Sequence, residues 1–422
     1  MRLEIAYGSR YLPLEVADDN LIGIIRPPVS AAVADGEQLV LAALENPVGT
    51  VPLGEIIRRK AARNAVVVVN DLTRPTPNQQ MLPPLLAQIE QAGIKAEDIT
   101  LIIATGIHRP HTEEENRSIF GAEIADRYKI VNHDCDRNLV SLGTLSNGLE
   151  LEINRTAADA DLLVTIGVVG LHYFAGYSGG RKSILPGIAS RQAIEANHKM
   201  MSDRRACLGN YQDNPVSDLM LEAARRAQVD FILNVVTQSK YDIAYCAAGE
   251  VGSAWLEAVR FCERMNTVEI GSRADIVIAS CGGYPKDINM YQAQKALDSA
   301  LLAVKPGGSI ILAAECREGL GEDTFQAWIE QSDCPQDIVD RFNHQFELGG
   351  HKAYAICRVL DHAQIMLLSD LPADLVGKMY MQPVQSLEEA LSLAMERQGQ
   401  GAGILVLPEA TKIAVTVHER KL

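Results

Sequence analysis

The sequence has no dense cluster of cysteine or of basic residues. Its eight cysteines are widely spaced, and none forms a C-x-x-C pair or a spacing typical of a zinc knuckle. The 54 acidic side chains outnumber the 39 basic ones, which gives a formal net charge of −15. We therefore expect free thiols in a reducing compartment and no nucleic-acid partner, because nucleic-acid binding requires a basic surface.

Long hydrophobic segments are also absent. The longest nearly uncharged apolar stretch covers residues 162–171, which is too short for a transmembrane helix, and residues 1–5 contain no apolar signal region. The 422 residues are 47% hydrophobic and 22% charged, as in ordinary globular proteins. We expect a cytoplasmic protein of two or three domains, without a membrane partner.

Short β-branched segments alternate with amphipathic segments along the chain. The segments that predict strands are residues 65–69, 99–104, 162–166, 231–236, 276–279, 310–313, 365–368 and 404–407. The segments that predict helices are residues 78–92, 191–201, 215–228, 251–264, 290–304 and 387–397. This alternation predicts an α/β fold with largely parallel sheets, and a polar stretch at residues 266–274 predicts a boundary between two domains.

Several predicted strands end in polar or glycine-rich loops. These loops are residues 70–75, 105–110, the segment from Gly167 onward, and 280–285. Open α/β sheets bind ligands beyond the carboxyl ends of their strands, so these loops are expected to form a binding site.

The segment 172–187 has the highest density of candidate functional residues. It contains four glycines together with His172, Arg181 and Lys182, which is typical of a backbone cradle for an anion such as phosphate. The segment differs from a P-loop because Arg181 replaces the second glycine and Pro186 would interrupt the following helix. A nucleoside triphosphate site is therefore not expected.

Three of the nine histidines lie near these loops. His108 and His172 follow predicted strands, and His198 lies in a predicted helix. Imidazole transfers protons near neutral pH and binds metals, so these residues fit an acid/base pair or a three-histidine zinc site. The other histidines are interpreted as structural: 111, 133, 344, 351, 362 and 418.

Two further pairs remain open between structural and functional interpretations. Asp71 and Arg74 can close a turn, or they can hold a hydroxyl and an anion. Gln292 and Lys295 share a helix face and can be solvated, or they can bind an anionic substrate near the helix start.

Together, these segments resemble the nickel-dependent lactate racemase family, whose members racemise or epimerise 2-hydroxy acids. The resemblance covers nearly the whole chain, and its motifs occur in the family's order: Asp71–Arg74, Thr105–Pro110, His172, Ser178–Lys182, His198 and Tyr291–Lys295. It implies two Rossmann-like α/β domains with the active site in the crevice between them. Residues 1–268 would carry the cofactor tether and catalytic histidines, and residues 269–422 would contribute substrate-binding residues.

The resemblance also implies a nickel-pincer nucleotide cofactor, the nickel complex of pyridinium-3,5-bisthiocarboxylic acid mononucleotide. It assigns covalent attachment to Lys182 and nickel ligation to His198. His108 and His172 would be the catalytic acid/base pair. The remaining roles implied are nucleotide binding by Asp71, Leu72, Thr73 and Arg74, and substrate binding by Arg74, Tyr291, Gln292 and Lys295.

Inversion at C2 gives an independent reason for two histidines. Passing a hydride to a cofactor and back to the opposite face inverts the centre through a 2-keto acid, and each enantiomer needs its own base for the hydroxyl proton. The expected partners are a short 2-hydroxy acid, such as lactate or malate, and cofactor-biosynthesis proteins; the oligomeric state is left open. Two alternatives remain: a zinc hydrolase using the three histidines, and a non-catalytic phosphate- or nucleotide-binding module.

Overall fold

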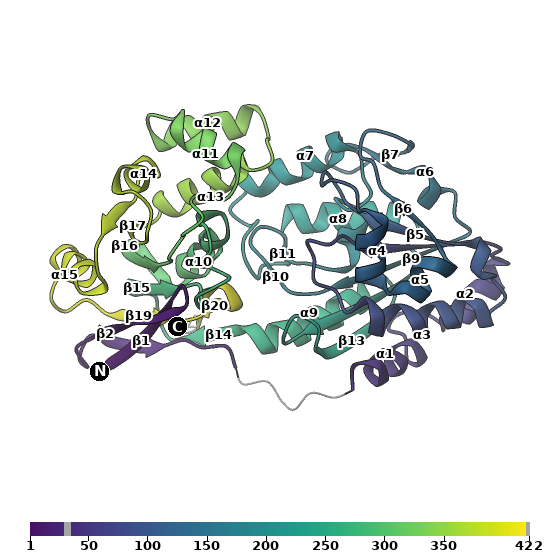
Figure 1. The fold of residues 1–422 in the computed structure, drawn as a ribbon, viewed down its shortest axis with the longest axis horizontal. Coiled ribbons are helices and arrows are strands. Elements are labelled where there is room, and N and C mark those ends of the chain that lie inside the picture. Colours follow the sequence, from purple (N-terminus) through teal and green to yellow (C-terminus); the bar gives the residue numbers. More distant parts are fainter. Residues whose placement is uncertain (29–34, 419–422) are drawn as a thin grey trace. The chain divides into compact units, whose positions relative to one another are not determined.

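A computed structural model of the chain describes residues 1–28 and 35–418. The chain divides into two compact units. We name Ser30–Arg264 the central unit, and Met1–Val29 together with Met265–Leu422 the terminal unit. Figure 1 shows the elements of both units, coloured along the sequence.

The central unit is built on a six-stranded sheet of order β13-β12-β9-β4-β5-β6. All neighbours in it are parallel except β12 and β13. Its strands are β4 (Ala65–Asn70), β5 (Ile99–Ala104), β6 (Lys129–Asn132), β9 (Leu162–Val168), β12 (Phe231–Thr237) and β13 (Ile243–Gly249). Strands β4 and β9 are mostly apolar and buried along nearly their whole length, because protein covers both faces of the sheet.

Helices of the central unit pack on this sheet. Leu82 and Leu85 belong to the same buried cluster as Val67 and Val164, which places their helix on one face of the sheet. The helices are α1 (Gly36–Glu45), α2 (Leu53–Lys60), α3 (Asn78–Gln91), α4 (Glu113–Phe120), α5 (Ala122–Arg127), α6 (Arg155–Ala158), α7 (Arg191–Lys199), α8 (Pro215–Arg226) and α9 (Ser253–Asn266). Two antiparallel pairs complete the unit: β7 (Leu139–Thr144) with β8 (Glu150–Asn154), and β10 (Leu171–His172) with β11 (Gly176–Tyr177).

The strand order reverses between β4 and β9. The chain passes from β4 to β5 and β6 on one side, and then returns to place β9 and β12 on the other side. The loops after β4 and β9 therefore diverge at the carboxyl edge of the sheet, where open α/β sheets bind ligands. These two loops carry Asp71–Arg74 and the segment from His172 to Lys182.

The terminal unit has a second six-stranded sheet, of order β18-β17-β16-β15-β19-β3, in which all neighbours are parallel. Its strands are β3 (Leu21–Ile24), β15 (Ala274–Ser280), β16 (Val304–Ala313), β17 (Gln364–Leu368), β18 (Gln382–Val384) and β19 (Ile404–Leu407). Its helices are α10 (Met290–Ala303), α11 (Asp323–Glu330), α12 (Pro335–His344), α13 (Gly350–Leu360), α14 (Ala373–Lys378) and α15 (Leu387–Gln398). β14 (Thr267–Ile270) pairs with β20 (Ala414–Val417) in a separate parallel pair.

The first residues of the chain belong to the terminal unit, so the division is not a single boundary at residue 268. Strand β3 forms the edge of the second sheet because Leu21 pairs with Ile404 and Ile24 with Val406. The hairpin of β1 (Arg2–Tyr7) and β2 (Arg10–Glu15) buries Ile5 in the same apolar cluster as Ile278 (Figure 1).

The mixed α/β fold with parallel sheets confirms the predicted class, and the predicted strand and helix segments all occur. Several of the strands that the sequence pattern missed lie at sheet edges or in hairpins, among them β1–β3, β6 and β13. Within residues 1–28 and 35–418, none of the helices combines the length and apolarity that crossing a bilayer requires.

Candidate active site

Three loops meet at the carboxyl edge of the central sheet. The amide of Gly106, after β5, donates to the carbonyl of Gly187 at 3.0 Å, which joins the His108 loop to the end of the glycine-rich segment. The amide of Gly180 donates to Asn234 Oδ1 on β12 at 2.9 Å. The sheet therefore brings together the loops that the sequence analysis identified separately.

Asp71 and His108 form a direct pair. His108 Nδ1 lies 2.7 Å from Asp71 Oδ2, and Asp71 is only 4% exposed. Thr73 Oγ1 donates to the same carboxylate at 2.9 Å. Burial alone would raise the pKa of Asp71, but the hydrogen bond and charge of His108, with Thr73 and Arg74, lower it overall. The ionised carboxylate fixes the Nδ1–H tautomer of His108 and leaves the lone pair at Nε2.

The 71–74 turn is closed by its backbone, since the amide of Arg74 donates to the carbonyl of Asp71 at 3.0 Å. The amide of Leu72 donates to His111 Nε2 at 2.8 Å, so His111 supports this turn as a structural histidine. The Arg74 side chain is exposed, and its charge lowers the pKa of both Lys182 and His198. Arg74 is thus an exposed cation near the other candidate residues.

His172 lies in the hairpin formed by β10 and β11. The amide of Ala175 donates to His172 Nδ1 at 3.3 Å. The adjacent Phe174 ring is buried, and its centre lies 4.6 Å from the His172 ring and 5.1 Å from the His198 ring. Lys182 Nζ lies 5.5 Å from the centre of the same ring. Phe174 therefore contacts three of the predicted site residues.

Lys182 lies in the short 3-10 helix η2 (Gly180–Ser183), which contacts β4, β9 and β12. The turn into η2 requires glycine at position 179, where φ is +79° and a Cβ would lie 2.6 Å from Val169 Cγ2. Burial, followed by the positive charges of Arg74 and Arg181, lowers the pKa of the Lys182 amine well below its ordinary value. A neutral amine at this position is a nucleophile.

His198 lies on α7 and is held by its own helix. Its Nδ1 is 2.8 Å from the carbonyl of Ile194, which can only accept, so Nδ1 carries the proton and Nε2 the lone pair. Burial, the largest cause, together with the charge of Arg74, lowers the pKa of His198 to about 3. A neutral imidazole with an oriented Nε2 has the properties of a metal ligand.

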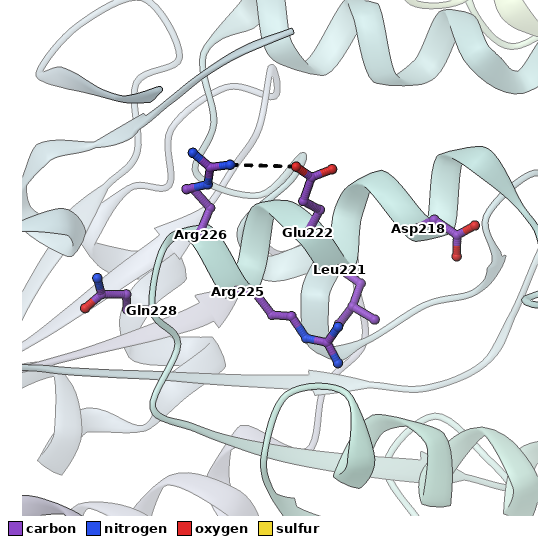
Figure 2. A pocket seen from close by; sticks show the side chains of 6 residues that line it. All are labelled: Asp218, Leu221, Glu222, Arg225, Arg226 and Gln228. Carbon is purple, nitrogen blue, oxygen red and sulfur yellow. Dashed lines mark ion pairs between the residues drawn. The ribbon is translucent and has the colours of Figure 1, made fainter. Parts of the chain in front are cut away.

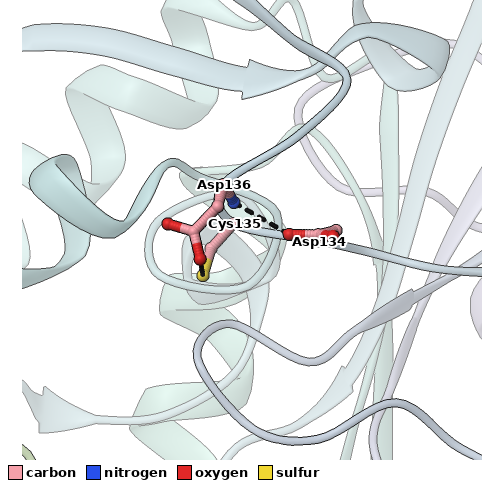
Figure 3. Close-up of side chains that lie close together, drawn as sticks. All are labelled: Asp134, Cys135 and Asp136. Atoms are coloured by element: carbon pink, nitrogen blue, oxygen red, sulfur yellow. Dashed lines mark hydrogen bonds between the residues drawn. The ribbon is translucent and has the colours of Figure 1, made fainter.

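The three histidines do not form the zinc site considered from the sequence. Histidine, cysteine and acidic side chains can all bind a metal ion. In the part of the chain that the structure describes, one group of three of them has its ligand atoms within 4.8 Å of one another, namely Asp134, Cys135 and Asp136 (Figure 3). This group is a local turn in which Asp136 also pairs with Arg191 at 2.7 Å. The three histidines do not form such a group in the described residues, and the Phe174 ring contacts both His172 and His198, so the structure does not support the three-histidine zinc site.

A hollow of about 550 Å³ lies elsewhere, on the surface of α8. Figure 2 shows its lining side chains, which come from one helix and the turn that follows it: Asp218, Leu221, Glu222, Arg225, Arg226 and Gln228. None of the predicted site residues lines this hollow, and its lining includes no histidine, cysteine or lysine.

The terminal unit places Tyr291, Gln292 and Lys295 in the first turns of α10. Lys295 Nζ donates to Gln292 Oε1 at 2.6 Å, which confirms that the two side chains share a helix face. Behind this face lies the buried Lys352, which sequence reasoning did not single out. Its Nζ donates to Gln294 Oε1 at 2.8 Å and lies 5.1 Å from the centre of the Tyr291 ring.

Two family models match the chain in order. Residues 7–209 match the lactate racemase N-terminal domain, and residues 270–416 match the lactate racemase C-terminal domain. The lactate racemase of Thermoanaerobacterium thermosaccharolyticum is 38% identical over 424 residues, which cover 98% of this chain and 99% of that protein. The lactate racemase of Lactiplantibacillus plantarum is 34% identical over 427 residues, with coverage of 98% and 99%.

Solved structures show the same relationship. The lactate racemase apoprotein from Thermoanaerobacterium thermosaccharolyticum superposes with a TM-score of 0.90 at 37% identity, covering 99% of this chain and 100% of that chain. A crystal structure from Thermotoga maritima, at 18% identity and a TM-score of 0.62, shares the fold. The fold and the comparisons define an α/β isomerase of the racemase class. The chain belongs to the lactate racemase family, which favours an enzyme over a non-catalytic phosphate-binding module.

The lowered pKa of Lys182 predicts selective chemical labelling of the cofactor-free protein. An ordinary lysine, with a pKa of about 10.4, is almost fully protonated at pH 7, whereas Lys182 is neutral to a much larger extent. We expect cyanate to carbamylate Lys182 at least about tenfold faster than the exposed Lys129 at pH 7, with the ratio falling toward pH 10. Peptide mass spectrometry measures both rates. Equal rates at pH 7 would show that the Lys182 amine is protonated.

Proposed function

We propose that this protein inverts C2 of a short 2-hydroxy acid, with lactate as the first candidate substrate. One observation carries the proposal: in the central unit, the Phe174 ring contacts His172, His198 and Lys182. The family resemblance implies acid/base, metal-ligand and tether roles for these residues, and the chain belongs to the lactate racemase family. The lactate racemase names of its relatives support lactate as the substrate.

His108 is assigned as the base for one enantiomer. The Asp71 carboxylate holds Nδ1–H at 2.7 Å, so Nε2 can accept the substrate's hydroxyl proton and the resulting imidazolium is stabilised. Because this carboxylate is engaged with His108 and Thr73, we assign Asp71 to positioning the base rather than to contacting the nucleotide.

His172 is assigned as the acid/base partner of His108. Its Nδ1 accepts from the Ala175 amide, so the neutral ring carries its proton on Nε2, from which it can donate. The two enantiomers place their hydroxyl groups differently, so one imidazole takes the proton while the second returns a proton to the inverted product. His108 and His172 come from the ends of different strands, after β5 and after β9, which allows them to approach the substrate from different directions.

The residues of the central unit fit a covalently attached nickel-pincer nucleotide. When bound, this group supplies a reversible acceptor for the C2 hydride of the substrate. The neutral Lys182 amine can form the covalent link, and Nε2 of His198 is oriented as a nickel ligand. Leu72, Thr73 and Arg74 form an exposed turn that suits the nucleotide, with the Arg74 guanidinium available for its phosphate.

Arg74 and the start of α10 are assigned to the substrate. Arg74 is exposed, so its guanidinium can pair with the substrate's carboxylate. Lys295 supplies a cation, and because Gln292 Oε1 accepts from it, the Nε2 group of Gln292 is left as a hydrogen-bond donor. Tyr291 borders these two residues and limits the size of the substrate's side chain. We infer that cofactor-biosynthesis proteins supply the nickel-pincer nucleotide, as the family resemblance implies.

Replacing either histidine with glutamine is expected to slow racemisation. Loss of a positioned acid/base group lowers kcat by about 100-fold or more, and Asp71→Asn is expected to lower it by at least about tenfold because the tautomer of His108 is no longer fixed. Chiral chromatography of L- and D-lactate measures the rates. The two enantiomers have equal free energies, so kcat/KM must fall equally in both directions.

The matched control is His344→Gln, which removes an exposed imidazole of the terminal unit and is expected to leave the rate unchanged. Near-normal rates for both His108→Gln and His172→Gln would contradict the two-base assignment.

The roles proposed for Lys182 and His198 predict different losses in the enzyme that carries its cofactor: loss of the covalent adduct and loss of nickel, respectively. Lys182→Ala is expected to abolish the covalent adduct of nucleotide mass, because the only proposed attachment point is removed. His198→Ala is expected to keep the adduct and lower the nickel content by about tenfold or more, because one ligand is lost. Intact-protein mass spectrometry and metal analysis measure both, with Lys129→Ala as the control. An unchanged adduct on the Lys182→Ala protein would reject the tether.

A further inference from the structure

Arg181 is a fully buried cation next to the proposed tether, and the proposed chemistry does not use it. Its exposed fraction is 0%. The guanidinium carbon lies 3.6 Å from the centre of the Trp255 ring, which is a close cation–π stack. Burial lowers the pKa of Arg181 to about 9, so the side chain keeps its charge at neutral pH.

The guanidinium donates to backbone carbonyls of the hairpin that carries His172. Its Nη2 lies 3.2 Å from the carbonyl of Ala175 and 3.4 Å from that of Tyr177. The same nitrogen donates to Ser217 Oγ on α8 at 2.8 Å. Arg181 thereby connects the hairpin to α8 from the buried side.

Two other side chains hold neighbouring carbonyls of the same hairpin. Trp255 Nε1 donates to the carbonyl of Ser178 at 2.9 Å. Asn214 Nδ2 donates to the carbonyl of Phe174 at 2.9 Å. We name Arg181, Trp255, Ser217 and Asn214 the hairpin clamp.

An ordinary structural ion pair does not explain Arg181. Within the described residues, its guanidinium makes no ion pair, and its Nη1 has no hydrogen-bond partner. Burying a charge without a counter-ion is unfavourable, and an apolar side chain would fill the space at lower cost. The arginine is explained by its planar set of donors, which can stack on Trp255 and bind several carbonyls at once.

The backbone of Ala175 links this clamp to His172 through two successive peptide groups, which meet at the Ala175 Cα. Its carbonyl accepts from Arg181, and its amide donates to His172 Nδ1 at 3.3 Å. We propose that Arg181 is a positioning residue that acts through the backbone of Ala175 to hold the His172 imidazole in its reactive orientation. The kinetic part of this inference rests on the proposed role of His172, whereas the structural part does not.

Hydrogen exchange of the cofactor-free protein tests the clamp directly. Arg181→Lys keeps the charge but loses the planar stack and the paired donors. We expect amide exchange in residues 171–178 to accelerate at least about tenfold, with the rest of the central unit changed by less than about twofold. The control is Arg260→Lys, an exposed arginine on α9 paired with Glu257, which is expected to leave all rates unchanged. Unchanged exchange in 171–178 of a folded Arg181→Lys protein would overturn the proposal.

A milder variant covers the case in which Arg181→Lys does not fold. Ser217→Ala removes one acceptor of Nη2 and leaves the guanidinium in place. We expect the same hairpin amides to exchange about threefold faster, and no other segment to change. Exchange that rises uniformly over the central unit, or not at all, would contradict a local clamp.

Kinetics of the loaded enzyme then test the link to His172. We expect Arg181→Lys to lower kcat about tenfold with KM changed less than threefold, and to have less than a twofold effect in a His172→Gln background. In a His108→Gln background, the full tenfold loss should persist. Equal losses of kcat in both backgrounds would overturn the link to His172.

Faster hydrogen exchange in the hairpin of the Arg181→Lys protein, together with a fully active His172→Gln enzyme, would have a different meaning. It would support the hairpin clamp and reject the proposed role of His172.

Discussion

The site depends on the placement of nitrogen bases beside positive charge at the carboxyl edge of a parallel sheet. Burial lowers the pKa of both Lys182 and His198, and nearby cations reinforce the effect, which favours the neutral form of each. A neutral amine can form a covalent link, and a neutral imidazole can bind a metal, so the same constraint prepares both residues. The glycine-rich turn and the packing around Phe174 serve to keep these groups together.

The two proposed bases are supported in different ways. His108 has a buried carboxylate partner in Asp71, whereas His172 is held through a backbone amide and a buried arginine behind it. A carboxylate favours the imidazolium form directly, whereas a backbone amide that donates to Nδ1 orients the ring and places the proton of the neutral imidazole on Nε2. In the proposed reaction, whose substrate and product are mirror images, one histidine is therefore oriented by a charged carboxylate and the other by an uncharged backbone amide.

Sequence reasoning predicted the elements whose signals are local. The valine-rich strand at residues 65–69 and the helix at 290–304 follow from apolar periodicity, and the strand-end loops follow from where these elements stop. The roles at positions 182 and 198 came from the family resemblance, since spacing alone also allowed a zinc site. The Asp71–His108 pair and the Arg181–Trp255 stack join residues that are distant in sequence, so no local pattern marks them. Strand β3 was missed for the same reason, because its partner β19 lies near the other end of the chain.

The central claim is that inversion proceeds by transfer of the C2 hydrogen as a hydride, with the histidines handling only the hydroxyl proton. Racemisation of L-lactate in D₂O, followed by mass and NMR analysis of the product at C2, tests this claim most directly. The account predicts that D-lactate forms with its original hydrogen at C2, because a hydride does not exchange with solvent. Incorporation of solvent deuterium at C2 at the rate of racemisation would contradict it and would indicate abstraction of the C2 proton by one of the histidines.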